Sequence, residues 1–262
     1  MKYNFKKSMK GTAFSMILPL FIMGEVHANA EDVHRIIDIC TSSERVMKDY
    51  AMVGMKITYH DPQKDIDDSV KRVNKELKEM EGHKITKSLH AEEEALHTEW
   101  SKILGELKNA PTKEGALVLH DHVNTFAKHC ETLAEHLAAD TGNPAEHYVV
   151  LIARLNLDVQ ELAGTYVLKS WGAIEDKAYY DEVHHILKDF NAAYDELETA
   201  DEDMVSKSVK EKLTVIKKHF MVFEFMAESK SGRYVPLLIA KKAESIHKET
   251  TEILLQEESE VE

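Results

Sequence analysis

Apolar residues recur at alternating intervals of three and four residues along nearly all of the chain after residue 30. Ile66, Val70, Val73, Leu77 and Met80 show the pattern most plainly, and three later segments repeat it. This spacing places apolar side chains on one face of an α-helix, whereas a β-strand would alternate every second residue. We therefore expect helices over about 32–59, 63–81, 86–108, 113–139, 145–171, 177–199, 203–229 and 234–257.

Residues that begin or interrupt helices separate these segments. Asp61-Pro62 and Asn143-Pro144 each combine an N-cap residue with a proline suited to the first helical turn. The connections that remain are short, and short connections favour antiparallel neighbouring helices. The 10 Gly and 5 Pro of the 262 residues are too few for a β fold with many turns. The sequence predicts an all-α fold of two tandem up-down four-helix bundles with about eight helices.

The N-terminus has the three parts of a secretory signal peptide. Residues 1–10 contain four Lys and no acid, residues 11–24 are uncharged and largely apolar, and Ala28 and Ala30 are small residues before a cleavage site. The apolar run is shorter than the ~20 residues that a membrane-spanning helix needs. We expect residues 1–30 to be a cleaved signal peptide, and the mature protein to be soluble, secreted or periplasmic, with no membrane insertion after cleavage.

The charge of the chain excludes one large class of partners. It contains 33 Lys or Arg and 47 Asp or Glu, a formal net charge of −14. Because binding to nucleic-acid phosphates requires clustered Lys and Arg, we expect no nucleic-acid partner.

The two cysteines, Cys40 and Cys130, fall on the expected first and fourth helices. In an up-down bundle these helices are antiparallel neighbours, and both residues then lie at nearly the same height along them. An oxidising compartment permits a disulfide between them. The alternative is two small side chains within the core.

The chain also repeats itself at an offset of 116 to 117 residues. Tyr50 aligns with Tyr166, and Asn74 aligns with Asn191, among several apolar positions that match in the same register. Shared helical periodicity matches apolar positions by default, so the paired polar residues are the better sign of duplication. The sequence therefore predicts two repeats, 31–141 and 142–262.

Residues 43–54, which include Arg45 and Tyr50, resemble the first-helix signature of the PilJ/NarX-type sensor domain. That domain is the N-terminal ligand-binding bundle of type IV pilus chemotaxis transducers and nitrate sensor kinases. Residues 154–172 are similar to the same signature, most clearly at their end. The resemblance implies two diverged copies of an extracytoplasmic four-helix bundle, usually a homodimer, which in some members binds nitrate or nitrite between first-helix arginines.

Transferred to this sequence, the resemblance implies a small-anion site at Arg45 and Arg154, because guanidinium groups hold planar anions well. Each copy keeps only one of the two arginines: Asp38 aligns with Arg154, and Glu161 aligns with Arg45. If the first helices of the two bundles pack together, salt bridges Asp38–Arg154 and Arg45–Glu161 are expected where homodimeric relatives hold an anion.

A metal site is the rival interpretation. Three Glu-x-x-His elements place a carboxylate and an imidazole one helical turn apart, as in di-iron bundles: Glu94 and His97, Glu182 and His185, and Glu244 and His247. A di-iron site needs two such elements within one bundle and further inward Glu residues. The second bundle has two elements, but the apolar core residues around His185 place that histidine near the flank of its helix. We therefore expect no metal and no other cofactor, with the di-iron-like site as the alternative.

Catalytic motifs are absent from the sequence: it contains no glycine-rich phosphate loop and no Gly-x-Ser-x-Gly. We expect a protein that is not an enzyme, an exported sensory or ligand-binding accessory protein without its own signalling output. Its expected partners are a small anion such as nitrate or nitrite and a membrane sensor or transducer. A purely structural or interaction module is the further alternative.

Overall fold

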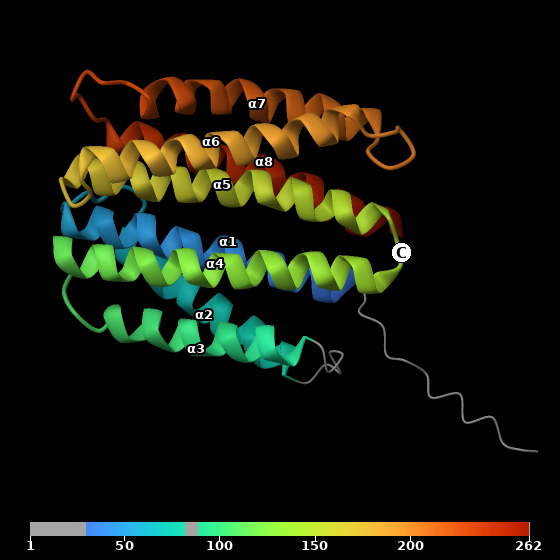
Figure 1. Cartoon of the computed structure of the whole chain (residues 1–262), viewed down its shortest axis with the longest axis horizontal. Coiled ribbons are helices and arrows are strands. Elements are labelled where there is room, and N and C mark those ends of the chain that lie inside the picture. Colours follow the sequence, from blue (N-terminus) through green and yellow to red (C-terminus); the bar gives the residue numbers. More distant parts are fainter. Residues whose placement is uncertain (1–29, 82–88, 262) are drawn as a thin grey trace, which may run out of the picture.

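The computed structural model describes residues 30–81 and 89–261. The described residues form eight helices and no strand, so the protein is all-α as predicted. The expected signal peptide lies outside the described residues, apart from Ala30. The helices are α1 (Ala30–Gly54), α2 (Pro62–Met80), α3 (His90–Glu106), α4 (Lys113–Thr141), α5 (Ala145–Trp171), α6 (Asp176–Thr199), α7 (Lys207–Ala227) and α8 (Pro236–Val261) (Figure 1).

Most helix ends lie within a few residues of their predicted positions, and the exceptions have local causes. Helix α1 ends at Gly54 rather than near residue 59, since Lys56, His60 and Asp61 adopt positive φ values that no helix accommodates. Helix α7 begins later than predicted because the side chain of Ser206 caps it, accepting a hydrogen bond from the N–H of Val209 at 3.3 Å.

Helices α1 and α5 form the centre of the molecule, and the others surround them (Figure 1). Helix α1 packs against α2, α4 and α5, while α5 packs against α1, α4, α6 and α8. Because each central helix has neighbours on most of its sides, polar residues along it are buried as well as apolar ones. The α1–α5 contact is the packing of first helix against first helix that the repeat suggested.

Helices α1 and α5 run in the same direction, in a register equal to the repeat offset (Figure 1). A Cβ atom on Gly164 would lie 3.5 Å from the Cγ atom of Met47, and one on Gly54 would lie 2.2 Å from the ring of Trp171. Both pairs are 117 residues apart in the sequence. Gly54 therefore provides the space that the Trp171 ring occupies at the end of α1.

The polar residues that marked the repeat make equivalent contacts in the two halves. The hydroxyl of Tyr50 is hydrogen-bonded to the backbone of Thr112 just before α4, and that of Tyr166 accepts from the N–H of Val235 just before α8 at 2.9 Å. Each tyrosine thus fixes the start of the last helix in its half.

The paired asparagines act in the same way one layer further out. The side-chain oxygen of Asn74 on α2 accepts from the indole N–H of Trp100 on α3 at 2.8 Å. That of Asn191 on α6 accepts from the ammonium group of Lys217 on α7, and Lys217 lies 117 residues after Trp100. These matched contacts support a duplicated origin of the two halves.

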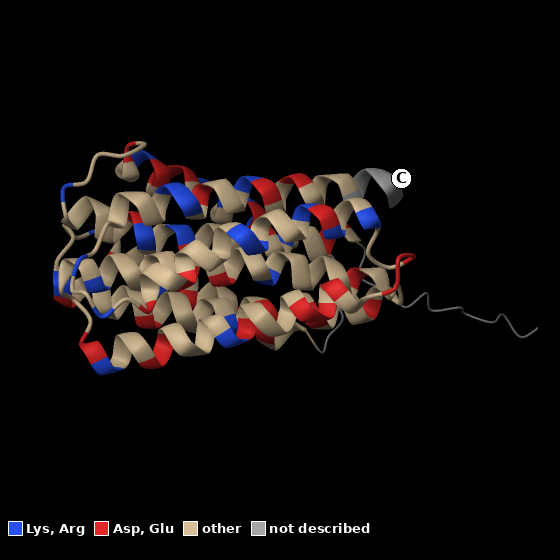
Figure 2. Ribbon diagram, turned by 90° about the horizontal axis from the view of Figure 1, so that it is seen from above, with Lys and Arg blue, Asp and Glu red and all other residues tan. Residues whose placement is uncertain are grey.

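None of the described helices combines the length and apolarity needed to span a bilayer. Charged residues are distributed along the outer helices, with a cluster of acidic residues at the end of α6 and in the connection to α7 (Figure 2).

Candidate functional site

A groove of about 500 Å³ runs between α1, α2 and α8, beside the central helix pair. Its volume lies within the range of ~300–1,000 Å³ that is usual for small-molecule sites. Ile37, Thr41 and Leu254 are buried side chains that line it, together with Asn156 of α5, which is 2% exposed. Charged side chains of both signs from α1 and α2 surround this interior.

The charged side chains at the groove are arranged as ion pairs. Arg72 of α2 reaches Asp38 of α1 at 3.1 Å, and both side chains are substantially exposed. Arg35 is buried and lies 2.5 Å from Glu31, 3.0 Å from Glu79 and 3.8 Å from Glu76. Its Nε atom is buried without a hydrogen-bond partner. The groove therefore offers an exposed pair that can open to a ligand, beside a buried guanidinium that three carboxylates surround.

At the α8 side of the groove, His247 lies between Arg45 and Asn156. The Nη1 atom of Arg45 is 3.1 Å from Nε2 of the ring, and the amide of Asn156 is 3.0 Å from Nδ1. A guanidinium can only donate, so Nε2 accepts from Arg45, while the atom of Asn156 nearest to Nδ1 is the amide nitrogen Nδ2. Burial, and next the charge of Arg45, lower the pKa of His247 to about 4. The ring is therefore neutral at physiological pH.

The two arginines of the expected anion site lie apart and are both paired with acids. Arg45 is 3.2 Å from Glu244 of α8 in addition to its contact with His247. Arg154 is 3.3 Å from Glu131 and 3.9 Å from Glu135, both on α4. A small anion at either guanidinium would have to displace a carboxylate of the protein.

The predicted salt bridges Asp38–Arg154 and Arg45–Glu161 are wrong. Asp38 pairs with Arg72, and the two arginines pair with α8 and α4. The two central helices do pack together, as supposed, but these four side chains point from the seam toward the flanking helices. Positions that align in the sequence lie at nearly one height in a parallel pair, but they face each other only where both side chains point into the seam.

A cluster of carboxyl groups lies on the other side of the seam. It comprises Glu44 of α1, Glu131 of α4, Asp158 and Glu161 of α5, and Glu182 of α6. Burial, and next the charge of Glu161, raise the pKa values of Glu44 and Asp158 well above their ordinary range. Burial and the charge of Glu182 raise the pKa of Glu161 to about 7. Both shifts favour the protonated forms of Glu44 and Asp158.

One histidine compensates part of this negative charge. Nε2 of His120 on α4 lies 2.9 Å from Glu182, whose carboxylate also accepts from the hydroxyl of Thr165. Burial alone would lower the pKa of His120, but the hydrogen bond to Glu182 and the negative charges of Glu182, Glu161 and Asp121 together outweigh it and raise the pKa. Burial likewise opposes ionisation of Glu182, but the bond to His120 lowers its pKa. Both shifts favour the charged forms of the pair, whereas the shifts of Glu44, Asp158 and Glu161 favour their protonated forms.

The sequence analysis did not single out Glu44, Asp158 or His120. The available signal was acids within the two segments that match each other in the repeat, since a charged side chain is rarely buried without a reason. The repeat could have strengthened it, because Glu44 and Glu161 are 117 residues apart, the same offset as the α1–α5 contacts.

The three Glu-x-x-His elements lie on different helices and make separate contacts. His97 of α3 is near Glu81 at 3.8 Å, and His185 of α6 is near Asp189 at 3.3 Å. Glu182 pairs with His120, and His247 with Arg45, as described above. Within residues 30–81 and 89–261, no group of three or more His, Cys, Asp and Glu could hold a metal ion.

Cys40 and Cys130 are buried neighbours, as expected from their predicted positions at nearly the same height along α1 and α4. The structure holds them as free thiols that hydrogen-bond to each other. Burial raises both pKa values, which keeps both sulfurs protonated and unreactive. The disulfide stays a prediction of the sequence, while the structure shows the alternative of two small side chains in the core.

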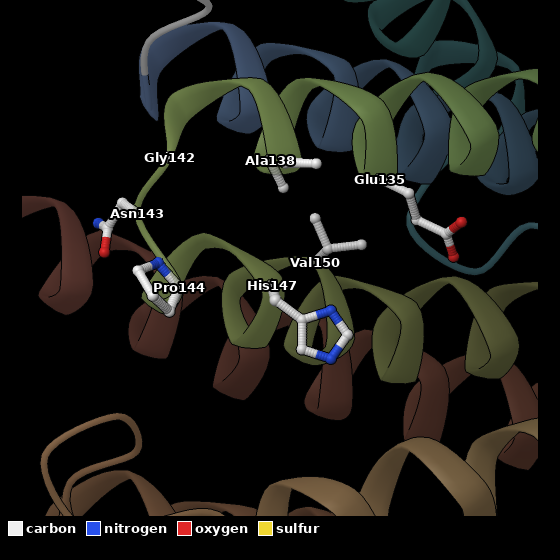
Figure 3. Close-up of a pocket in the computed structure, with 8 residues that line it drawn as sticks. Glu135, Ala138, Gly142, Asn143, Pro144, His147 and Val150 are labelled. Carbon is white, nitrogen blue, oxygen red and sulfur yellow. The ribbon is translucent and has the colours of Figure 1, made fainter.

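A second hollow, of about 300 Å³, lies at the turn between α4 and α5 (Figure 3). Ala138, Pro144 and Val150 give it an apolar surface, with Glu135 and His147 at the sides. His147 is engaged by Glu196 at 2.7 Å. This hollow has few polar groups that could orient a ligand, so the α1–α2–α8 groove is the stronger candidate site.

Comparison with known proteins assigns no function to this site. No protein-family model, curated protein or solved structure matches this chain.

Proposed function

We propose that this protein is an exported sensory or ligand-binding accessory protein, and that it holds a small polar molecule in the α1–α2–α8 groove. The observation that carries the proposal is the groove itself. It combines a suitable volume with a buried interior, an exposed ion pair and a buried guanidinium whose Nε donor has no hydrogen-bond partner.

The charges of the groove favour a ligand that carries both signs. When the exposed Asp38–Arg72 pair opens, Arg72 can receive a carboxylate and Asp38 can receive an ammonium group. Neutral His247 adds no positive charge for a simple anion. A small zwitterion such as an amino acid can replace the Asp38–Arg72 contact on both sides at once, so neither charge is left unpaired.

Two features of the sequence support a sensory role. The first-helix segments around Arg45 and Arg154 resemble the PilJ/NarX-type sensor domain, and the N-terminal 30 residues have the parts of a signal peptide. A protein of this kind would bind its ligand and then contact a membrane sensor or transducer, which responds to the bound form.

Thermal unfolding of the purified protein tests this proposal. The panel consists of the twenty amino acids, small dicarboxylates, nitrate and nitrite, each added separately after EDTA treatment. Ligand at ~100 times its dissociation constant adds about 2.7 kcal/mol, which for a chain of this size raises the midpoint by about 5–10 °C. We expect a selective shift with a zwitterion.

The variants Arg72→Gln and Asp38→Asn locate the binding. Both should abolish the shift, and both residues are exposed enough to be changed without loss of folding. Lys71→Gln is the matched control, because Lys71 is the exposed neighbour on the same helix and should leave the shift intact. The proposal fails if no compound shifts the midpoint, or if the shift survives both groove variants. A nitrate shift that only Arg154→Ala removes would instead place the site beside Arg154, between α4 and α5.

A further inference from the structure

The surface of α7 and the first half of α8 differs in charge from the rest of the molecule. Residues 205–250 contain ten Lys or Arg and five Asp or Glu, a net charge of +5, while the whole chain carries −14. The remaining residues therefore carry −19. Such an asymmetry concentrates positive potential on one side of an acidic protein.

The same segment carries most of the large apolar side chains that are exposed in the described part of the chain. We call this set the α7–α8 apolar face: Val215, Met221, Val222, Phe225, Val235, Leu237 and Leu238. Phe225 is 77% exposed. An exposed apolar set of this size on a folded protein usually marks a binding surface.

The α7 members of this set lie on one side of the helix. Val215 lies six and seven residues before Met221 and Val222, and Phe225 lies four and three residues after them. These spacings bring all four side chains to the outward side of the helix. The core side of α7 is a separate buried stripe that includes Phe220 and Phe223. Figure 1 shows α7 at the outer edge of the molecule. The apolar face is thus a convex helix surface rather than a groove.

Cations beside this face are free of carboxylate partners. Within the described part of the chain, the side chains of Lys218, Arg233 and Lys242 form no ion pair, although the protein has an excess of acids. Lys218 lies one turn before Met221 and Val222 on the same side of α7. By contrast, Lys217 turns inward to Asn191. Unpaired cations and exposed apolar side chains therefore share one surface.

We propose that the α7–α8 apolar face docks peripherally on a membrane surface rich in anionic phospholipid. Phe225, Met221 and the leucines at the start of α8 would enter the boundary between headgroups and acyl chains, while Lys218, Arg233 and Lys242 meet the phosphates. A convex amphipathic surface with cations beside its apolar side chains is what an anionic bilayer binds. A symmetric contact between two copies would bring two positive surfaces together, so charge argues against a second copy as the occupant.

Flotation of the purified protein with lipid vesicles tests this inference. We expect binding to vesicles of equal parts phosphatidylglycerol and phosphatidylcholine at low salt, and loss of binding to pure phosphatidylcholine or at high salt. Each cation near such a surface is worth about a fivefold change in partition, so Lys218→Gln combined with Lys242→Gln should weaken binding ~25-fold. Met221→Ser combined with Phe225→Ser should also weaken it.

The matched control is Leu117→Ser combined with Val118→Ser, two exposed apolar residues of α4, which should bind as the unmodified protein does. Circular dichroism verifies that every variant is folded. The inference is overturned if anionic vesicles do not bind, or if the serine variants of α7 bind unchanged. It is also overturned if light scattering shows a dimer that these variants abolish, or if the face binds soluble polyglutamate but no vesicles, which would indicate an acidic protein partner.

Discussion

Replacing Glu161 by Gln should stabilise the protein above neutral pH and have little effect in acid. The pKa of Glu161 is raised from 4.5 to about 7, first by burial and next by the charge of Glu182. The folded protein therefore holds this proton more tightly than the unfolded chain does. Stability that is present below pH 4.5 is lost as the pH rises through 7, because the folded state must then bury a charge among carboxylates.

The magnitude follows from the size of the shift. Each pKa unit corresponds to 1.36 kcal/mol, so ionisation of Glu161 costs the folded state up to about 3 kcal/mol at pH 8. Gln has nearly the same shape and no charge. We expect Glu161→Gln to gain most of this free energy at pH 8 and to match the unmodified protein near pH 4.5.

Urea unfolding followed by circular dichroism, repeated between pH 4.5 and pH 8.5, measures this difference. Glu252→Gln is the control, since Glu252 is an exposed residue of α8 and should shift stability by no more than ~0.5 kcal/mol at any pH. Parallel curves for Glu161→Gln and the unmodified protein across the whole range would refute the argument that Glu161 is a buried, proton-holding member of the cluster.

Three other changes test separate parts of the structure. His247 has the opposite pH dependence, because burial and then the charge of Arg45 lower its pKa to about 4. The free energy of unfolding should therefore decrease by up to about 3 kcal/mol as the pH drops from 6.5 to 4. In urea titrations, His247→Gln should make this decrease smaller. Gly54→Ala should destabilise the protein by ~1–3 kcal/mol, because the new Cβ atom would lie 2.2 Å from the Trp171 ring. Gly105→Ala meets open space and should stabilise the protein by ~0.5–1 kcal/mol. Equal thermal unfolding midpoints for the two variants would contradict this packing. Tyr50→Phe and Tyr166→Phe should each cost ~1–3 kcal/mol in chemical denaturation, because each removes the hydroxyl bonded to the backbone before α4 or α8, and a large loss for only one of them would argue against equivalent roles.

The candidate site was only partly accessible to sequence reasoning. Arg45 and Asp38 were singled out, and both lie at or beside the α1–α2–α8 groove. Their partners Arg72, Glu244 and His247 could not be assigned, because they come from helices whose position around α1 depends on packing. The buried acids Glu44 and Asp158 were missed for the same reason: an acid on a helix is normally solvated, and only neighbours on several sides bury it.

The sequence by itself determined the helices and predicted the repeat. Local spacing of apolar residues, the Asp61-Pro62 and Asn143-Pro144 pairs, and the matched Tyr and Asn residues depend on the order of residues along the chain, and they predicted eight helices and equivalent contacts in the two halves. Tertiary structure alone decided which side chains meet across the α1–α5 seam. A repeat offset fixes the height of a residue along two parallel helices, but the direction of its side chain around the helix is set by where the neighbouring helices pack.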